Sequence, residues 1–191
     1  IWGYYQLLNK KNTGFKKKVL GQTVWLGVGA KLPSGKYNPA DKNSASSDIN
    51  LFQLGTGSFD FNTGLMYDTR LQDAGMNITA NYKINSKNKY DYRYGSKINL
   101  NAQFYYKFNI KNTIVLAPNA GLQYEYSDLD TEKGLTVSVS GGKLLSGVAG
   151  LEIVYKKIAA GFNFQTQLSQ QLALGIVEAG NRLMIHCSFA F

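Results

Sequence analysis

The sequence predicts an all-β protein, an antiparallel transmembrane β-barrel of the bacterial outer membrane, from three observations. Apolar and polar residues alternate along extended segments through most of the 191-residue chain. Short and long connections alternate between these segments. Aromatic residues on the apolar faces gather near the segment ends, as they do in the aromatic girdles of membrane barrels.

The composition favours strands over helices. The chain is 44% hydrophobic, 13% aromatic and only 17% charged, and aromatic residues are enriched in strands. No apolar run approaches the roughly 18 residues that a membrane-spanning helix requires. The length predicts one domain, residues 1–191.

The charged and metal-ligating residues exclude several function classes. The net charge is +9, but the basic residues are scattered among the connections rather than aligned in one stripe, so we expect no nucleic-acid partner. Cys187 is the one cysteine and His186 the one histidine, so neither an intrachain disulfide nor a Cys-His metal site can form. We therefore expect no cofactor and no metal.

Nine segments are predicted as strands because apolar residues recur at every second position, which places them on one side of an extended chain. The first segment, residues 1–8, is the least regular. The next three are residues 23–33, 58–68 and 76–84, and their apolar faces comprise Val24, Leu26, Val28, Ala30 and Leu32, then Phe59, Phe61, Leu65 and Tyr67, then Met76, Ile78, Ala80, Tyr82 and Ile84.

The last five predicted strands are residues 97–109, 114–126, 145–155, 158–168 and 182–191. The sequence KINLNAQFYYKFN at 97–109 is the most regular, with an apolar or aromatic residue at every even position. Segment 145–155 departs from the alternation at Val148 and Val154.

The length of these strands separates two folds that share the same alternation, a soluble β-sandwich and a membrane barrel. Most segments have about 11 to 15 residues, against about 5 to 6 in globular proteins. A tilted strand needs about 9 to 11 residues to cross the hydrocarbon of a membrane. The length therefore favours the barrel.

The connections alternate in length along the chain. Short links are predicted at residues 71–73, 110–111 and 156–157, and long ones at 34–55, 85–96, 128–142 and 169–181. Short turns at one end and long loops at the other are typical of outer-membrane barrels, whereas a Greek-key sandwich has no reason to keep this order.

Aromatic side chains on the apolar faces are predicted to form two bands around an aliphatic zone, although Phe104, Phe162 and Phe164 lie outside them. The long-loop band contains Phe59, Phe61, Tyr82, Tyr124 and Tyr126, and the short-turn band contains Tyr67, Tyr106, Phe108, Tyr155, Phe189 and Phe191. Such bands are expected where rings meet lipid head groups.

The opposite faces are predicted to line a polar lumen, since they carry charges of both signs that can pair or stay hydrated. The candidate lumen-lining residues are Asp60, Asp68, Lys83, Asn99, Asn101, Lys107, Glu125, Glu152, Asn163, Gln165 and Arg182. Glycines on the same faces should make room for the larger side chains, and these are Gly27, Gly29, Gly64, Gly121, Gly150 and Gly161.

Counting strands from the C-terminus, which should lie on the periplasmic side, gives an odd number, whereas closed single-chain bacterial barrels have an even number. We therefore expect further residues before Ile1, with a signal peptide and one or three more strands, and ten to twelve strands in the full protein.

Two stretches resemble known outer-membrane proteins. The C-terminal LMIHCSFAF, with Phe189 and Phe191, resembles the signal that the barrel-assembly machinery reads. LGVGAKLPSGKYN (26–38) followed by LGTGSFDFNTGLMY (54–67) resembles small outer-membrane barrels of the meta-pathway phenol-degradation, or transporter-like, family, and the matching residues are Lys31, Leu32, Pro33, Gly35, Gly55, Thr56, Gly57, Ser58, Phe59 and Asp60. The resemblance implies passage of small, often apolar compounds and no catalysis.

The sequence leaves more than one function open. The leading hypothesis is a porin-like channel or facilitator for small molecules, and the alternative is a non-conducting structural or accessory barrel subunit of a larger envelope complex. A barrel enzyme using His186 and Ser188 is not expected, because no convincing nucleophile and base are present. Expected partners are outer-membrane lipids, the assembly machinery and a protein contacting exposed loops such as KYDYRYG (89–95).

Overall fold

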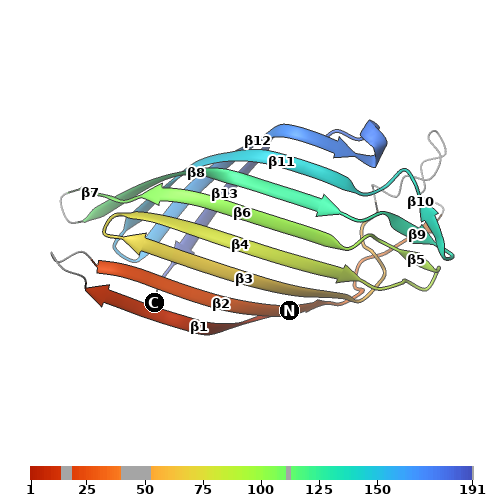
Figure 1. Cartoon of the computed structure of the whole chain (residues 1–191), viewed down its shortest axis with the longest axis horizontal. Coiled ribbons are helices and arrows are strands. Elements are labelled where there is room, and N and C mark those ends of the chain that lie inside the picture. Colours follow the sequence, from red (N-terminus) through yellow and green to blue (C-terminus); the bar gives the residue numbers. More distant parts are fainter. Residues whose placement is uncertain (14–18, 40–52, 111–112, 191) are drawn as a thin grey trace.

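A computed structural model describes residues 1–13, 19–39, 53–110 and 113–190. Within these residues, nine long strands lie side by side in one antiparallel sheet, in the order β1-β2-β3-β4-β6-β8-β11-β12-β13. Figure 1 shows the sheet curling, with its last strand behind the others. The strand bounds are β1 (Trp2–Thr13), β2 (Val19–Lys31), β3 (Asp60–Leu71), β4 (Ala74–Asn85), β6 (Lys97–Tyr106), β8 (Ile114–Ser127), β11 (Gly142–Tyr155), β12 (Ile158–Leu172) and β13 (Arg182–Phe189).

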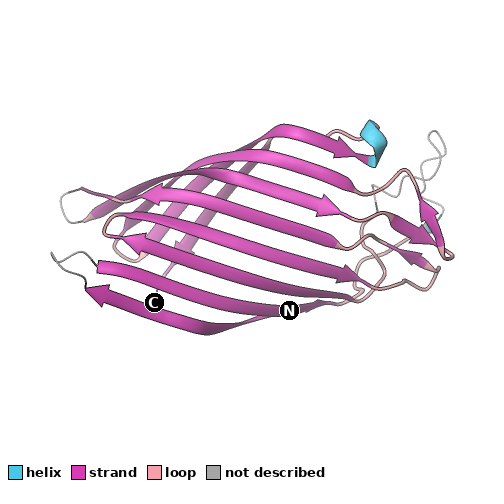
Figure 2. Cartoon of the chain, in the orientation of Figure 1, coloured by secondary structure: helices cyan, strands magenta, loops and turns pink. Residues whose placement is uncertain are grey.

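The all-β prediction is confirmed, and Figure 2 shows how strands dominate the chain. The predicted strand 97–109 is interrupted at Lys107, beyond which β7 (Phe108–Ile110) continues to pair with β8. The backbone N–H of Lys107 donates to the carbonyl oxygen of Asp73 at 2.8 Å, so the interruption leaves this donor satisfied.

Short turns and long loops lie at opposite ends of the sheet, as the sequence predicts. The tight turns after β3 and β11 each contain a non-glycine residue with positive φ, Gln72 at 57° and Lys156 at 52°. This left-handed backbone suits two-residue hairpins, because their twist then matches that of the strands. The long-loop end carries a second sheet, in the order β10-β9-β5, from β5 (Tyr92–Arg93), β9 (Asp130–Glu132) and β10 (Leu135–Val137). At the same end, the 3₁₀-helix η2 (Ala173–Gly175) follows β12 (Figure 1).

One face of the sheet exposes large apolar side chains along its whole width, as a lipid-facing surface does. Among them are Leu26, Phe61, Leu65, Ile78, Tyr82, Leu100, Phe104, Tyr106, Leu122, Tyr124, Ile153, Tyr155, Phe162, Leu183, Ile185 and Phe189. Cys187, on the same face as Leu183 and Ile185, is also exposed. The predicted aromatic bands are reproduced at both ends, while Phe191 lies outside the described residues.

The two outer strands of the sheet order, β1 and β13, are not paired with each other in the described part of the chain. The described chain starts at the long-loop end, where the amino group of Ile1 donates to the carbonyl of Ala30, and β13 runs to the short-turn end, where Phe189 lies opposite Ile158. The expectation of ten to twelve strands stays a prediction. No helix within the described ranges is long and apolar enough to cross a membrane.

The direction of the two faces can be tested with spin labels. On a Cys187→Ala background, a nitroxide on Leu100→Cys should be relaxed by oxygen dissolved in lipid, because Leu100 lies on the apolar face and is 44% exposed. A nitroxide on the neighbouring Asn101→Cys should instead be relaxed by a water-soluble nickel chelate. The opposite pattern in electron paramagnetic resonance of the reconstituted protein would show that the faces are assigned the wrong way round.

Candidate lumen and its entrance

All eleven candidate lumen residues lie on the face opposite the apolar one. Residues paired across neighbouring strands share a face, and the pairs connect the candidates from β3 to β13. Asn99 lies opposite both Asn81 and Glu125, and Gln165 lies opposite Arg182. Asp60, Asp68, Lys83, Asn101, Glu152 and Asn163 join this face through their own pairs, and Lys107 lines a cavity with Asp68 and Glu152.

This inner face is concave, because side chains meet across it from strands that are not neighbours. Arg182 on β13 donates to Oε1 of Glu125 on β8 at 2.8 Å, over two intervening strands. Nε2 of His186 on β13 lies 3.4 Å from Oε2 of Glu152 on β11, across β12. A flat sheet would hold these groups apart, so the inner face encloses space.

Glycines on the inner face make the room that the sequence predicts. A Cβ atom at Gly161 would lie 2.6 Å from Cε1 of His186, which bridges over it toward Glu152. A Cβ at Gly150 would meet the side chain of Asn163 on the neighbouring strand. Each glycine therefore accommodates one larger neighbour.

An aromatic pair also faces inward, and sequence reasoning missed it. Trp2 and Tyr4 lie opposite Gly29 and Gly27, and their rings stack with centroids 5.6 Å apart and planes 10° apart. A Cβ at Gly27 would lie 2.6 Å from the Tyr4 ring, so the two rings pack directly on the backbone of the glycines. Gly27 and Gly29 of β2 are the signal in the sequence that could have predicted this pair. Inward glycines leave space that large side chains of the neighbouring strand can fill.

The short-turn end of the inner face contains a cavity of about 520 Å³. Its charged lining includes Lys11, Arg70 and Lys107 together with Asp68 and Glu152. The hydroxyl of Tyr105 donates to the Asp68 carboxylate at 3.3 to 3.4 Å. This polar cavity cannot be a lipid-facing groove.

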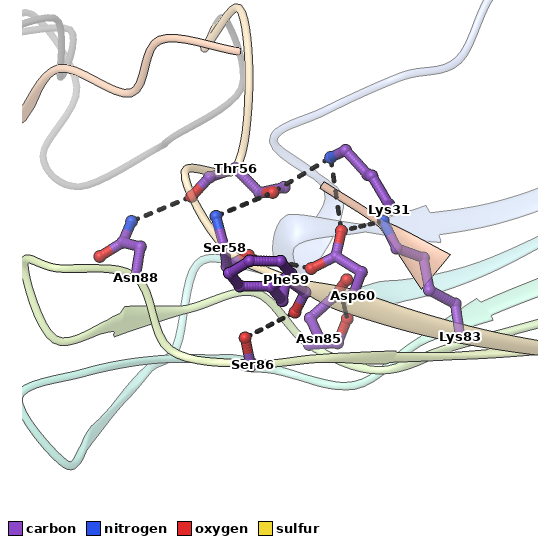
Figure 3. Close-up of polar contacts among 10 residues, drawn as sticks. Lys31, Thr56, Ser58, Phe59, Asp60, Lys83, Asn85, Ser86 and Asn88 are labelled. Atoms are coloured by element: carbon purple, nitrogen blue, oxygen red, sulfur yellow. Dashed lines mark hydrogen bonds and ion pairs between the residues drawn. The ribbon is translucent and has the colours of Figure 1, made fainter. Parts of the chain in front are cut away.

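The long-loop end of the inner face carries a network of polar contacts (Figure 3). Asp60 is 0% exposed and is the most deeply buried carboxylate among the described residues. Its Oδ2 forms ion pairs with Nζ of Lys83 at 2.9 Å and with Nζ of Lys31 at 3.3 Å. The Ser58 hydroxyl donates to its Oδ1 at 2.9 Å, and Lys31 donates to Oγ1 of Thr56 at 3.0 Å. The network thus joins the starts of the long loops to β2, β3 and β4.

The network contains four of the ten residues that carry the sequence resemblance, Lys31, Thr56, Ser58 and Asp60, and three of the glycines pack beside it. The backbones of Gly35 and Gly55 touch, since a Cβ at Gly35 would lie 2.8 Å from Cα of Gly55. Gly57 has a positive φ of 64° and packs on Tyr37. KLPSG and LGTGSFD therefore fold against each other and together form the entrance.

The Tyr-rich segment 89–95 is exposed in part, since Tyr90 is 39% exposed whereas Tyr92 is buried, and a partner contact there stays a prediction. Tyr92 is 1% exposed, packs against Tyr37 with ring centroids 5.8 Å apart, and donates to Oδ2 of Asp130 at 2.5 Å. Burial raises the pKa of the Tyr94 hydroxyl, and the neighbouring Tyr37 and Asp130 raise it further. Packing within the loops therefore uses Tyr92 and Tyr94, while Tyr90 stays exposed.

The described residues contain no group of three His, Cys, Asp or Glu side chains that could hold a metal ion. The imidazole of His186 contacts Glu152, and in the described part of the chain no hydroxyl is hydrogen-bonded to it. Apolar side chains also interrupt the inner face, because Leu144, 1% exposed, and Val148 point inward from β11.

Comparison with known proteins identifies one similar family. A family model described as "Autotransporter beta-domain" matches residues 12–180, from the end of β1 through β12. No curated protein and no solved structure matches the chain. The finer resemblance to the phenol-degradation barrels stays a prediction.

Replacement of the buried carboxylate should weaken the entrance. Asp60→Asn keeps an acceptor for Ser58 but leaves Lys31 and Lys83 facing each other without a counter-charge. We expect a loss of about 1–3 kcal/mol in unfolding free energy, less than for a fully buried pair because both lysines are partly hydrated. Asp91→Asn, which breaks the exposed 3.9 Å pair with Lys87, should change it by less than about 0.5 kcal/mol in the same urea titration. Equal effects of the two substitutions would contradict the role given to Asp60.

The inner glycines can be compared with an outer one on the same strand. A Cβ at Gly150 would lie 2.5 Å from the backbone oxygen of Phe162, so Gly150→Ala should cost about 1–3 kcal/mol. Gly147 faces outward and its nearest neighbour would be Leu168 at 3.6 Å, so Gly147→Ala should be neutral or slightly stabilising. Urea unfolding in detergent micelles measures both. A neutral Gly150→Ala would mean that the inner face is more loosely packed than described.

Proposed function

We propose that this chain, which belongs to the autotransporter β-domain family, provides a passage for small molecules through the outer membrane. The family consists of outer-membrane β-barrels of Gram-negative bacteria, so the chain is an outer-membrane β-barrel protein. The passage is the further step, and it is argued from the inner face.

The observation that carries the proposal is the contrast between the two faces of the sheet. The outer face is apolar and exposed, whereas the inner face holds amides, paired charges and a polar cavity of about 520 Å³. A barrel that only anchored other proteins could fill its interior with apolar side chains. Hydrated polar groups on a concave face instead support movement of solutes along it.

Two observations bear on which class of molecule passes through the barrel. The entrance residues resemble those of the phenol-degradation barrels, which supports small compounds. The family match supports a second candidate, passage of a polypeptide, because the family description names autotransporters. The polar lining suits an extended backbone as well as a small solute, since both need hydrogen-bond partners.

We also propose that the chain is not an enzyme. A hydrolytic site would need a hydroxyl or thiol aligned with a base. His186 is instead positioned toward Glu152, and Cys187 points to the lipid-facing side. Both placements are consistent with a passive barrel.

Single-channel recording tests the passage with the protein purified from outer membranes in detergent. On a Cys187→Ala background, we expect steady conductance in planar bilayers, and a bulky methanethiosulfonate reagent should reduce it in Asn101→Cys. Leu100→Cys should be unaffected, because its side chain lies on the apolar face. Block of Asn101→Cys alone would place the current inside the barrel.

A silent protein would contradict the passage of small molecules. Silence together with stoichiometric co-purification of another envelope protein would favour the alternative role, a structural or accessory subunit. Silence with an attached polypeptide protected inside the barrel from protease would favour the second candidate.

A further inference from the structure

The charges on the inner face are unbalanced in favour of cations. In the described residues, strand register or cavity lining places eight basic side chains on this face, namely Lys10, Lys11, Lys31, Arg70, Lys83, Lys97, Lys107 and Arg182. The acidic side chains on the same face are four, namely Asp60, Asp68, Glu125 and Glu152. Eight minus four leaves a surplus of four positive charges, without counting His186.

Half of the surplus lies at the entrance. Lys31, Lys83 and Lys97 line a pocket of about 270 Å³ at the long-loop end, and Asp60 is the one carboxylate that contacts any of them in the described chain. Lys97 lies directly opposite Lys83 and has no ion-pair partner among the described residues. Like charges in directly opposed strand positions are destabilising, so folding alone does not account for this pair.

The middle of the inner face is neutral but rich in donors. Glu125 is paired with Arg182, which cancels both charges. The neighbouring positions carry amides, Asn81, Asn99, Asn101 and Gln123. Amide NH₂ groups donate to anions without adding charge, so an anion leaving the entrance finds partners further along the face.

The short-turn end carries a cationic surplus of the same size. Four cations, Lys10, Lys11, Arg70 and Lys107, line the larger cavity with two carboxylates. Asp68 there accepts from Tyr105, and Glu152 contacts His186. The two carboxylates thus already have partners, whereas the four cations line the cavity.

We propose that the lumen selects small anions, with the pocket of Lys31, Lys83 and Lys97 as the first binding position for an oxyanion such as a carboxylate or phosphate. Anion selection rests on the proposed passage, because a lumen that conducts nothing selects nothing. The anion-binding position does not depend on the passage. A cluster of like charges with low-dielectric walls raises the local concentration of its counter-ion. Three ammonium groups with one buried carboxylate leave two charges for the ligand.

The chain offers a matched pair of lysines for the test. Lys97 lies opposite Ser127 of β8, on the inner face. Lys143 lies opposite Tyr126, the neighbouring residue of β8, on the outer face. Lys97→Gln and Lys143→Gln remove the same charge at nearly the same depth. Neither lysine has an ion-pair partner in the described part of the chain, so both variants should fold.

The first arm measures reversal potential in a KCl gradient across a zwitterionic bilayer, which excludes anionic lipid as the occupant. We expect chloride to permeate about 3-fold or more above potassium, with a fall of about one third or more in Lys97→Gln and no change in Lys143→Gln. Equal permeabilities, a preference for potassium or the same ratio in Lys97→Gln as in the unchanged protein would overturn anion selection while leaving the passage intact.

The second arm measures binding of inorganic phosphate to the detergent-solubilised protein by phosphorus NMR line broadening. Lys97→Gln should raise the dissociation constant for phosphate by about 3-fold or more, and Lys143→Gln should leave it unchanged. Phosphate binding that depends on Lys97 in a protein that carries no current would support the anion site and overturn the passage. Failure of phosphate to bind, or binding insensitive to Lys97→Gln, would overturn the site.

Discussion

The structure depends on one constraint, that every backbone N–H and C=O within hydrocarbon must find its hydrogen-bond partner inside the protein. Seven of the nine long described strands, β2 to β12 in the sheet order, have a neighbour on both sides. Their registers run without a break over nearly all of the length, and irregularities occur between Gln6 and Leu8 and between Leu145 and Ser146. Where β6 ends, Asp73 accepts the N–H of Lys107. Such continuity fixes the side-chain alternation, because each register also decides which residues share a face.

The alternation then gives the two faces opposite chemistry, and packing rather than hydrophobic burial holds the inner one together. Few apolar residues of the described chain are buried, so a water-excluding core contributes little. The inner face uses instead the fit of large side chains over glycines, Trp2 on Gly29 and His186 on Gly161, and ion pairs that span the curve of the sheet. Arg182 with Glu125 does so over two strands. These contacts require the sheet to curl, which couples its curvature to the identity of the inner residues.

The sequence was sufficient for the strands and their faces because a period of two is a local property. It could not give contacts between strands far apart in the chain, such as Arg182 with Glu125 or Tyr37 with Tyr92, since these depend on curvature and loop path. Trp2 and Tyr4 were missed because the first strand has an irregular pattern around its bulge, and Leu144 because an apolar side chain at the end of a strand fits either face. The burial of Tyr92 in the Tyr-rich segment was not foreseen for a related reason, because composition favours an exposed interface as much as a packed loop.

The entrance shows how one group can serve the fold and set the charge at the same time. Asp60 holds β2, β3 and β4 together through Lys31, Lys83 and Ser58, and its carboxylate is buried while the two lysines stay partly exposed. A single carboxylate can offset only one of the two ammonium groups it joins. The contact that closes the strand ends therefore leaves a positive charge behind, and Lys97 on the next strand adds another. A second carboxylate would cancel the remaining charge of Lys31 and Lys83. It would have to occupy the buried position beside the lysines that Asp60 already fills. Folding the loop ends around one carboxylate thus accounts for the uncompensated charge beside Asp60, whereas Lys97 adds a charge that this contact does not require.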